Sequence, residues 1–509
     1  MGHGTKRQEM QELRELVGIV NRHKIKSLEL LGPTLPSSSK IMKLYRGISS
    51  GVFDSDEEAM GLLYGNPATA KNSYWKLKHD LKKRLLNTLF FIDQKQARQT
   101  AYERIFYNCH REFTAARFLL RRGARQVAVE LLHKVLKKAR QIELTPIELE
   151  ALQLLRHHYG VILGERRKFE DYNKKVLYCT ELYDAENKAD GFQEELLSYY
   201  VKDKSTKHQY FEMAQRYEAE LRRLMGRVNS KKLQHRVRFI SVAMNMIVND
   251  YEATVKSCLE AVRYFRRFSN LPDSYIRPYI YQLVVSYIQL QQYQKGEEAI
   301  QRLLDMLEPG QSNWFQGMEL HCILALHSKD YQKAHLLWLK SIGAPNFRHL
   351  YPSAREPWYI IEAFIHYIYK TGRIPNPGPG LERFRLAKFI NEVPLFAKDK
   401  RGYNIPILII QILFLLRQGE QDAVNERLDA LSRYALRHFR KGEHYRTHFF
   451  IKMLNQLPKA FFRRKELERR TASHLRQLQN LPLVMAREAH EIEIIPYENL
   501  WELLLEGLK

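Results

Sequence analysis

Cysteine is scarce in this chain of 509 residues, and its four copies stand far apart within apolar helical patterns. They form no CxxC pair and no spacing with histidine that is typical of a zinc site. Secreted domains use paired cysteines as covalent links, so this pattern predicts buried, reduced thiols. The first 20 residues are charged throughout and lack the apolar segment of a signal peptide, and we therefore expect an intracellular, cytoplasmic protein. The cysteines are Cys109, Cys179, Cys258 and Cys322.

Long hydrophobic runs are also missing. The most apolar stretch, Ile405 to Leu416, is 12 residues long and includes Pro406 and Gln411. A helix that spans a membrane needs about 20 predominantly apolar residues. This stretch therefore predicts a buried helix and no membrane span.

The sequence carries none of the short motifs that mark common catalytic or metal-binding sites. There is no HExxH, no GxSxG and no calcium-loop spacing, and residues 378–383 lack the Lys-Ser/Thr of a phosphate-binding loop. His444 and His448 are one helical turn apart, but no acidic or cysteine partner stands at matching spacing. We predict no catalytic residue, no cofactor, no bound metal and no enzymatic activity.

Basic residues outnumber acidic residues in this chain. The chain has 57 Asp and Glu against 82 Lys and Arg, which gives a formal net charge of +25 at pH 7. Such a balance favours polyanionic partners, either nucleic acid or an anionic membrane surface. The hydrophobic share of 45% and the charged share of 27% are those of an ordinary folded protein. We therefore expect folded structure nearly throughout.

What the chain does contain is a repeated helix-turn-helix pattern at 278–344. In both copies an apolar helix is followed by a short polar turn, then by Tyr-Gln-Lys and a small residue: Tyr293 and Gly296 in the first, Tyr331 and Ala334 in the second. This pattern resembles a tetratricopeptide repeat, in which the aromatic residue starts the second helix and the small residue lets the first helix approach closely. The resemblance implies a right-handed solenoid of helical hairpins, whose groove binds a peptide or helix of a protein partner.

Similar polar turns recur from residue 102 onward at intervals of 38 to 47 residues. Intervals of this length suit helical-hairpin arrays, so we predict an all-α fold with a helical-repeat body at 102–430. After one of these turns, Tyr251 and Ala253 repeat the order of aromatic and small residue. The turns are Arg122-Gly123, Gly164-Glu165, Asp203-Lys204, Asn249-Asp250, Gln291-Gln292, Lys329-Asp330, Thr371-Gly372 and Gln418-Gly419.

Ahead of this body, residues 1–39 predict one or two helices and a connector rich in proline and serine. Residues 40–93 predict a head of three helices, the second capped by Ser55. The third helix is basic, as in a helix-turn-helix domain, although its lysines can equally form the solvated face of an N-terminal cap. In the nucleic-acid interpretation the contacts come from Asn72, Ser73, Lys76 and Lys83.

The C-terminal region, 431–509, has the strongest charge asymmetry. Between 431 and 480 there are thirteen Lys and Arg against three Glu, with aromatic residues interleaved. This predicts either a groove that follows a nucleic-acid backbone or amphipathic helices with a solvated basic face. The acidic residues 481–509, with a short strand at 490–495 and a helix at 497–508, can fold back over it as a cap or dock a partner. The candidate nucleic-acid residues here are Arg437, Arg440, Arg463, Arg464 and Arg470.

Taken together, these patterns predict a non-enzymatic helical-repeat scaffold or adaptor that binds a protein partner. The alternative is a nucleic-acid-binding regulator with a helix-turn-helix head and a repeat-domain sensor. The two hypotheses differ in whether the basic surface binds nucleic acid. The sequence specifies neither the partner nor the oligomeric state.

Overall fold

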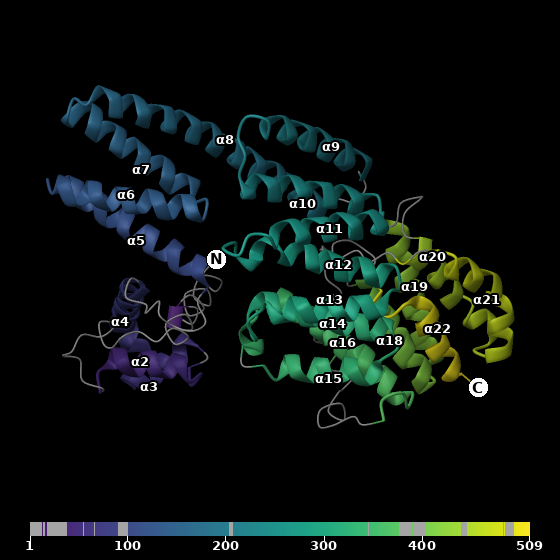
Figure 1. The fold of residues 1–509 in the computed structure, drawn as a ribbon. Helices are drawn as coiled ribbons and strands as arrows, with labels where there is room; N and C mark the ends of the chain where they lie inside the picture. Colours follow the sequence, from purple (N-terminus) through teal and green to yellow (C-terminus); the bar gives the residue numbers. More distant parts are fainter. Residues whose placement is uncertain are drawn as a thin grey trace. The chain divides into compact units, whose positions relative to one another are not determined.

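The chain forms two compact units, residues 1–172 and 173–509. Every regular element in the described ranges is a helix, and helices that follow one another along the chain pack in neighbouring pairs (Figure 1). The all-α expectation is thus confirmed, and the arrangement is compatible with a helical-repeat fold. The structure, a computed structural model, describes residues 13, 16–17, 38–53, 55–65, 67–89, 100–202, 207–344, 346–375, 389, 404–438, 445–481, 483 and 493–508.

The first unit begins with three helices that pack on one another: α2 (Lys40–Ser49), α3 (Asp56–Tyr64) and α4 (Pro67–Thr88). Ser55 caps α3 as predicted, since its hydroxyl accepts a hydrogen bond from the Glu58 backbone N–H at 3.2 Å. Leu13 and Val17, from the segment before the head, lie in the same apolar cluster as the three helices. The core of the head is therefore assembled from both predicted N-terminal segments.

One lysine of α4 departs from the expected solvated face. Lys78 is buried and forms an ion pair with Asp56 of α3 at 2.8 Å, and the Tyr74 hydroxyl donates to the same carboxylate at 2.6 Å. A buried charge is tolerated only when it is paired and hydrogen-bonded. This ion pair therefore joins α3 to α4, and Lys78 is not available to a ligand.

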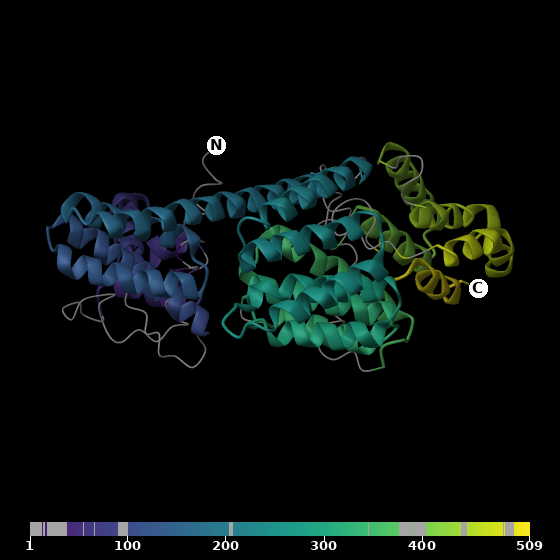
Figure 2. The same cartoon turned by 45° about the horizontal axis from the view of Figure 1, so that its top comes forward.

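The rest of the first unit is a row of antiparallel helices (Figure 2). These are α5 (Ala101–Arg121), α6 (Arg125–Gln141) and α7 (Thr145–His157), followed by a π-helical turn at His158–Ile162 and the start of α8 (Arg166–Lys202). A capping box at Thr100 and Glu103 begins α5.

The second unit continues the pattern of helix pairs. Its apolar cores lie between consecutive pairs rather than at one centre, as expected of stacked hairpins. Its helices after α8 are α9 (Lys207–Leu224), α10 (Lys231–Ile247), α11 (Tyr251–Phe265), α12 (Arg277–Gln289), α13 (Tyr293–Asp305), α14 (Ser312–His327), α15 (Tyr331–Ile342), α16 (Pro352–Lys370), α18 (Asn404–Gln418), α19 (Gln421–His438), α20 (Tyr445–Leu454), α21 (Arg464–Gln479) and α22 (Tyr497–Glu506).

The predicted turns share one backbone conformation. In each described turn one residue has a left-handed conformation, with φ between 56° and 82°. At six of them the next residue donates its N–H to the carbonyl five residues back, as Gln292 does to Tyr287 at 2.8 Å, which is the hydrogen bond of a Schellman motif. The turn at Asp203-Lys204 lies outside the described residues. The left-handed residues are Gly123, Gly164, Asn249, Gln291, Lys329, Gly372 and Gly419.

Two of the helices that follow these turns, α11 and α15, begin with an aspartate side-chain cap, and α11, α13, α15 and α19 have a buried residue one turn in. Asp250 and Asp330 accept hydrogen bonds from the backbone N–H three residues later, at 2.9 and 3.1 Å. The residue four positions after the cap is then buried against the preceding helix. After Asp250 that residue is Thr254, not the predicted Ala253. The buried set is Thr254, Gly296, Ala334 and Val424.

The apolar stretch at 405–416 forms α18, and Ile405 to Phe414 are all buried, so the buried-helix prediction is confirmed. Searched over its described helices, the protein has none long and apolar enough to cross a membrane. All four cysteines are described by the structure; they are buried and form no disulfide, as predicted. Burial raises the pKa of Cys109 to about 11 and that of Cys258 to about 12, which keeps both thiols protonated at neutral pH.

Candidate interaction site

A cavity of about 300 Å³ opens on the surface formed by α11, α12 and α13. We call it the basic cavity, because its rim has three cations and one carboxylate. Lys295, Glu298 and Arg302 are spaced three and four residues apart on α13, so they share one face of that helix. The lining residues are Leu259, Val262, Arg266, Ile280, Leu283, Tyr287, Lys295, Glu298, Ala299 and Arg302.

The floor of the basic cavity is apolar. Val262, Ile280, Leu283 and Ala299 are buried there, whereas Leu259 at the edge is 42% exposed. Concave sites with an apolar floor and a few oriented polar groups are the usual form of ligand pockets, and about 300 Å³ is at the small end of their range. The cavity therefore has room for one or two apolar side chains rather than for a large cofactor.

The rim charges favour an anionic occupant. Glu298 lies 3.9 Å from Arg302 in an exposed ion pair and so offsets one of the three cations, and Lys295 donates to the side chain of Gln292 at 2.9 Å. Arg266 makes no ion pair with any residue that the structure describes. The rim thus has an excess of positive charge beside an apolar floor.

A second, smaller cavity of about 80 Å³ lies among α8, α10 and α12. It is lined mainly by apolar residues, but two amide oxygens, those of Gln193 and Gln282, are buried beside it without a hydrogen-bond partner in the described chain. A buried acceptor of this kind requires a donor such as an ordered water. The cavity fits a few water molecules and not a peptide.

The four repeat-signature residues lie at helix crossings. Gly296 and Ala334 are buried, and a Cβ atom on Gly296 would be 3.0 Å from Leu324 Cδ1 of α14. Tyr331 is buried, and burial raises its pKa to about 12. Tyr293 is half-buried; its pKa is raised by burial and is also affected by the charges of Glu498 and Arg446. These positions are structural and do not line the basic cavity.

The predicted nucleic-acid residues of the head are exposed on α4. Asn72, Lys76 and Lys83 fall close together around the helix axis, since 100° per residue brings positions 72, 76 and 83 to one side. Ser73 is exposed beside them, and its carbonyl accepts from the Tyr64 hydroxyl at 3.3 Å. The exposed Asp80 also lies on this part of α4. The face is therefore accessible and modestly basic.

Two of the predicted C-terminal arginines form ion pairs within their own helix. Arg464 pairs with Glu468 at 2.9 Å and Arg470 pairs with Glu466 at 2.7 Å, in both cases within α21. Arg437 and Arg463 are exposed, and Arg440 lies outside the described residues. Two of the five charges are thus partly neutralised by their own helix.

The arginine that meets the acidic tail is a different one, Arg446. Its side chain is 2% exposed and holds the Glu493 carboxylate through two hydrogen bonds, at 2.6 and 3.0 Å, while Glu498 completes the group. Nη1 of the same guanidinium donates to the carbonyls of Leu478 and Leu481, each at 2.9 Å. Burial raises the pKa of Glu493, and the adjacent Arg446 guanidinium opposes that rise and keeps the carboxylate charged. The tail is therefore attached by a buried ion pair with satisfied hydrogen bonds.

From Glu493 onward the tail crosses hairpins formed more than 100 residues earlier. The Glu493 carbonyl is 3.0 Å from His327 Nε2 of α14, Glu502 pairs with Lys329 at 2.8 Å, and Glu506 pairs with Arg373. The strand expected at 490–495 is not formed by its described part, because these side-chain contacts, and not a β-ladder, hold the segment.

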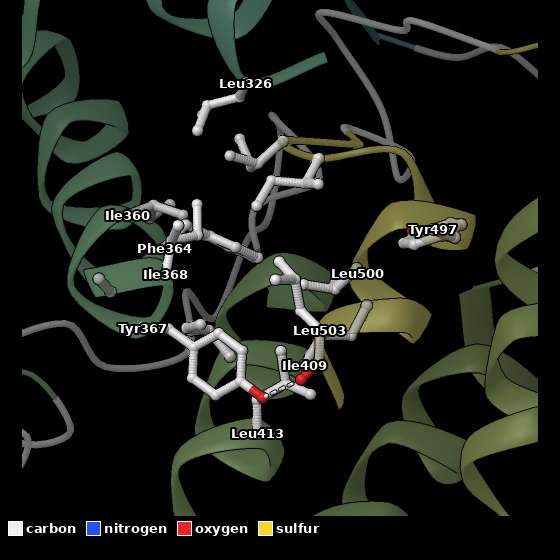
Figure 3. Packing of buried hydrophobic residues seen from close by; sticks show 14 of the residues in the cluster. Leu326, Ile360, Phe364, Tyr367, Ile368, Ile409, Leu413, Tyr497, Leu500 and Leu503 are labelled. Carbon is white, nitrogen blue, oxygen red and sulfur yellow. Dashed lines mark hydrogen bonds between the residues drawn. The ribbon is translucent and has the colours of Figure 1, made fainter. Parts of the chain in front are cut away.

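Apolar contacts complete the attachment of the tail (Figure 3). Leu500 and Leu503 point towards Phe364 and Tyr367 of α16, and the Tyr367 hydroxyl lies 3.5 Å from the Leu503 carbonyl. Trp501 is 1% exposed in the same cluster. In these contacts α22 covers apolar residues of α14, α16 and α18.

No family model, no curated protein and no solved structure matches this chain. In the ranges that the structure describes, no group of three or more His, Cys, Asp or Glu side chains could hold a metal ion. The class that the fold itself defines is an α-helical protein of stacked neighbouring helix pairs, and a cavity of ligand size opens on its second unit.

Proposed function

We propose that the protein is a cytoplasmic, non-enzymatic helical-repeat scaffold that binds a segment of another protein. The observation that carries this proposal is the basic cavity, an apolar recess with a cationic rim on α11, α12 and α13. The left-handed turns and the buried small residues support a tetratricopeptide-like, right-handed array for the second unit. In such an array the helix faces provide an extended surface for an extended or helical segment.

The chemistry of the cavity indicates the kind of segment. An apolar side chain that fills the recess between Leu259 and Leu283 contributes roughly 1.5–3 kcal/mol by burial. Each exposed ion pair with the rim contributes about 0–1 kcal/mol and is weakened by salt. The apolar anchor therefore supplies most of the affinity, and acidic neighbours set the orientation.

The test is a selection of random displayed peptides on the full-length protein, followed by affinity measurement with the synthesised winners. We expect peptides in which an apolar residue is flanked by Asp or Glu. Leu259→Asp and the double change Lys295→Glu/Arg302→Glu should each weaken binding by roughly ten-fold or more. The matched control is Arg433→Glu/Arg437→Glu on α19, which changes the net charge equally and should have no effect. Equal affinity for all four proteins would overturn the proposal.

A second candidate function, nucleic-acid binding by the head, is supported by the exposed face of α4 that holds Asn72, Ser73, Lys76 and Lys83. Lys76→Glu/Lys83→Glu should then abolish retention on duplex DNA. The melting temperature should hardly change, because exposed charges contribute little to stability. Retention that is unchanged would leave the head as a structural cap.

A further inference from the structure

The free ends of four helices in the first unit form a surface that the proposed function does not use. The end of α5, the start of α6, the π-helical turn after α7 and the start of α8 lie together, at the left of both ribbon views (Figures 1 and 2). Arg125 of α6 acts electrostatically on His158 of the π-helical turn, which confirms that these ends are close. We call this surface the α5–α8 tip.

The α5–α8 tip exposes large apolar side chains. Val161 is 70% exposed and Phe118 is 66% exposed, and Val161, Ile162 and Leu163 are consecutive in the chain. Isolated exposed apolar residues are normal, but a contiguous group usually marks an interaction surface. The exposed apolar residues of the tip are Phe118, Val127, Val161, Ile162, Leu163 and Phe169.

The same surface is strongly basic. Six cations stand among the apolar residues, and two of them are paired: Lys168 with Glu165 at 2.8 Å and Arg166 with Glu170 at 2.9 Å. The other four make no ion pair with the described residues. They are Arg121, Arg122, Arg125 and Arg167.

The tip is ordered by its own packing. The π-helical turn brings Gly160 so close to Phe169 that a Cβ atom there would lie 2.6 Å from the ring. Next to Gly160, the ring of Tyr159 stacks on that of Tyr172, with ring centroids 5.2 Å apart. The Tyr159 hydroxyl lies 3.1 Å from His133 Nε2. The outward position of Val161 and its neighbours is thus set by buried contacts, and π-helical turns often occur at functional positions.

We propose that the α5–α8 tip docks on an anionic lipid surface. Aliphatic side chains enter the boundary between headgroups and acyl chains, and the unpaired arginines meet lipid phosphates or carboxylates. The exposed rings of Phe118 and Phe169 suit either a membrane or stacked bases. The consecutive aliphatic residues Val161, Ile162 and Leu163 have no stacking partner in a nucleic acid. The combination of consecutive aliphatic residues and unpaired arginines therefore favours a membrane interface.

The test is co-sedimentation of the full-length protein with vesicles of phosphatidylcholine, with and without phosphatidylglycerol. The protein should bind only the anionic vesicles, and less as the salt concentration rises. Val161→Asp/Leu163→Asp should abolish binding, and Arg121→Glu/Arg122→Glu/Arg125→Glu should weaken it roughly 100-fold, at about five-fold for each arginine.

Matched controls keep the test specific. Leu336→Asp/Leu436→Asp changes two exposed leucines of the second unit, and Arg433→Glu/Arg437→Glu/Arg463→Glu reverses three exposed arginines there. Both controls should bind vesicles as the parent protein does. Absence of binding to anionic vesicles, or equal loss in the controls, would refute the proposal. So would a result in which the tip variants lose duplex DNA but not vesicles, since the tip would then be a nucleic-acid surface.

Discussion

Small residues at helix crossings decide how closely the hairpins of the second unit pack. Gly296 lies between Tyr287 of α12 and Leu324 of α14, where any Cβ atom is already in tight contact. Such a position tolerates no added volume without a shift of its neighbours. The role of this glycine is therefore close approach rather than backbone freedom.

Gly296→Leu should lower the free energy of unfolding by about 1–3 kcal/mol through overpacking. Gly191→Ala on α8 is the matched control, since a Cβ atom there meets nothing within 4 Å. It should stabilise the protein by roughly 0.5–1 kcal/mol through helix propensity. Urea denaturation measures both, and equal effects of the two changes would contradict the crossing account.

Buried histidines make the second unit sensitive to acid. The pKa of His327 is lowered from 6.5 to about 4, chiefly by burial and also by the charge of Arg446, while the hydrogen bond with the Glu493 carbonyl opposes the shift. The unfolded chain takes up this proton below pH 6.5, but the folded chain does so only near pH 4. Stability is therefore lost as the pH falls through that window, by about 3 kcal/mol for this group.

Glu493, whose pKa burial raises, contributes in the opposite sense, but the lowered pKa values of His327 and His235 together outweigh it, so we expect the urea midpoint to fall between about pH 6.5 and pH 4. His327→Gln should remove much of that slope, because glutamine has no proton to gain. His235, whose pKa burial lowers to about 3, should retain a share of it. Identical pH profiles for the variant and the parent would show that His327 does not titrate as described.

At the scale of the element, each described turn contains a residue in the left-handed backbone conformation, whether that residue is glycine or not. Gly123, Gly372 and Gly419 adopt this conformation easily, whereas Gln291 and Lys329 adopt it with a side chain. A left-handed conformation costs a residue with a Cβ atom roughly 1–2 kcal/mol. The tertiary packing of the hairpins outweighs that cost at these positions.

Gln291→Gly should therefore stabilise the second unit by up to about 1 kcal/mol, after the greater chain entropy of glycine is subtracted. Gly419→Ala should destabilise it by a similar amount. Thermal unfolding of both variants checks the two signs. A loss of stability in Gln291→Gly would mean that its side chain has a role in the turn.

The tail helix α22 is an element that the stacked helix pairs of the second unit need. Its apolar side chains Trp501, Leu504 and Leu503 are almost fully buried against earlier hairpins, and an open end of a helical array exposes its core. A chain that ends at Arg487 should therefore aggregate, with no gain in nucleic-acid binding. Glu502→Ala, which removes only an exposed ion pair, is the control and should change stability by less than about 1 kcal/mol. Tighter DNA binding by a monodisperse truncated protein would instead identify an autoinhibitory tail.

For the whole molecule, the sequence predicted the structural features that depend on residues close to one another in the chain. Helical type, the positions of the turns, the cap at Ser55 and the burial of Ile405 to Phe414 follow from periodicity and turn residues within a few positions. The placement of the small residue was one position off after Asp250, because the buried position four residues after this cap is Thr254 and not Ala253.

Features that depend on distant segments were not predictable. Lys78 is buried because Asp56 lies opposite it on another helix, 22 residues away in the chain. Among many arginines, Arg446 is the one that pairs with Glu493, and this follows only from the path of the C-terminal tail through the fold. The basic cavity arises from the spacing of three helices, although Lys295 and Arg302, seven residues apart on α13, were a sign of a cationic face.

The measurement that tests the central claim most directly is hydrogen–deuterium exchange of the full-length protein with and without a selected acidic-apolar peptide. The account predicts slower exchange in α11, α12 and α13, centred on Leu259, Leu283 and Ala299, and none in the Lys295→Glu/Arg302→Glu variant. Protection confined to α4, to the α5–α8 tip or to α22, or the same protection in the variant, would contradict a scaffold that binds its partner at the basic cavity.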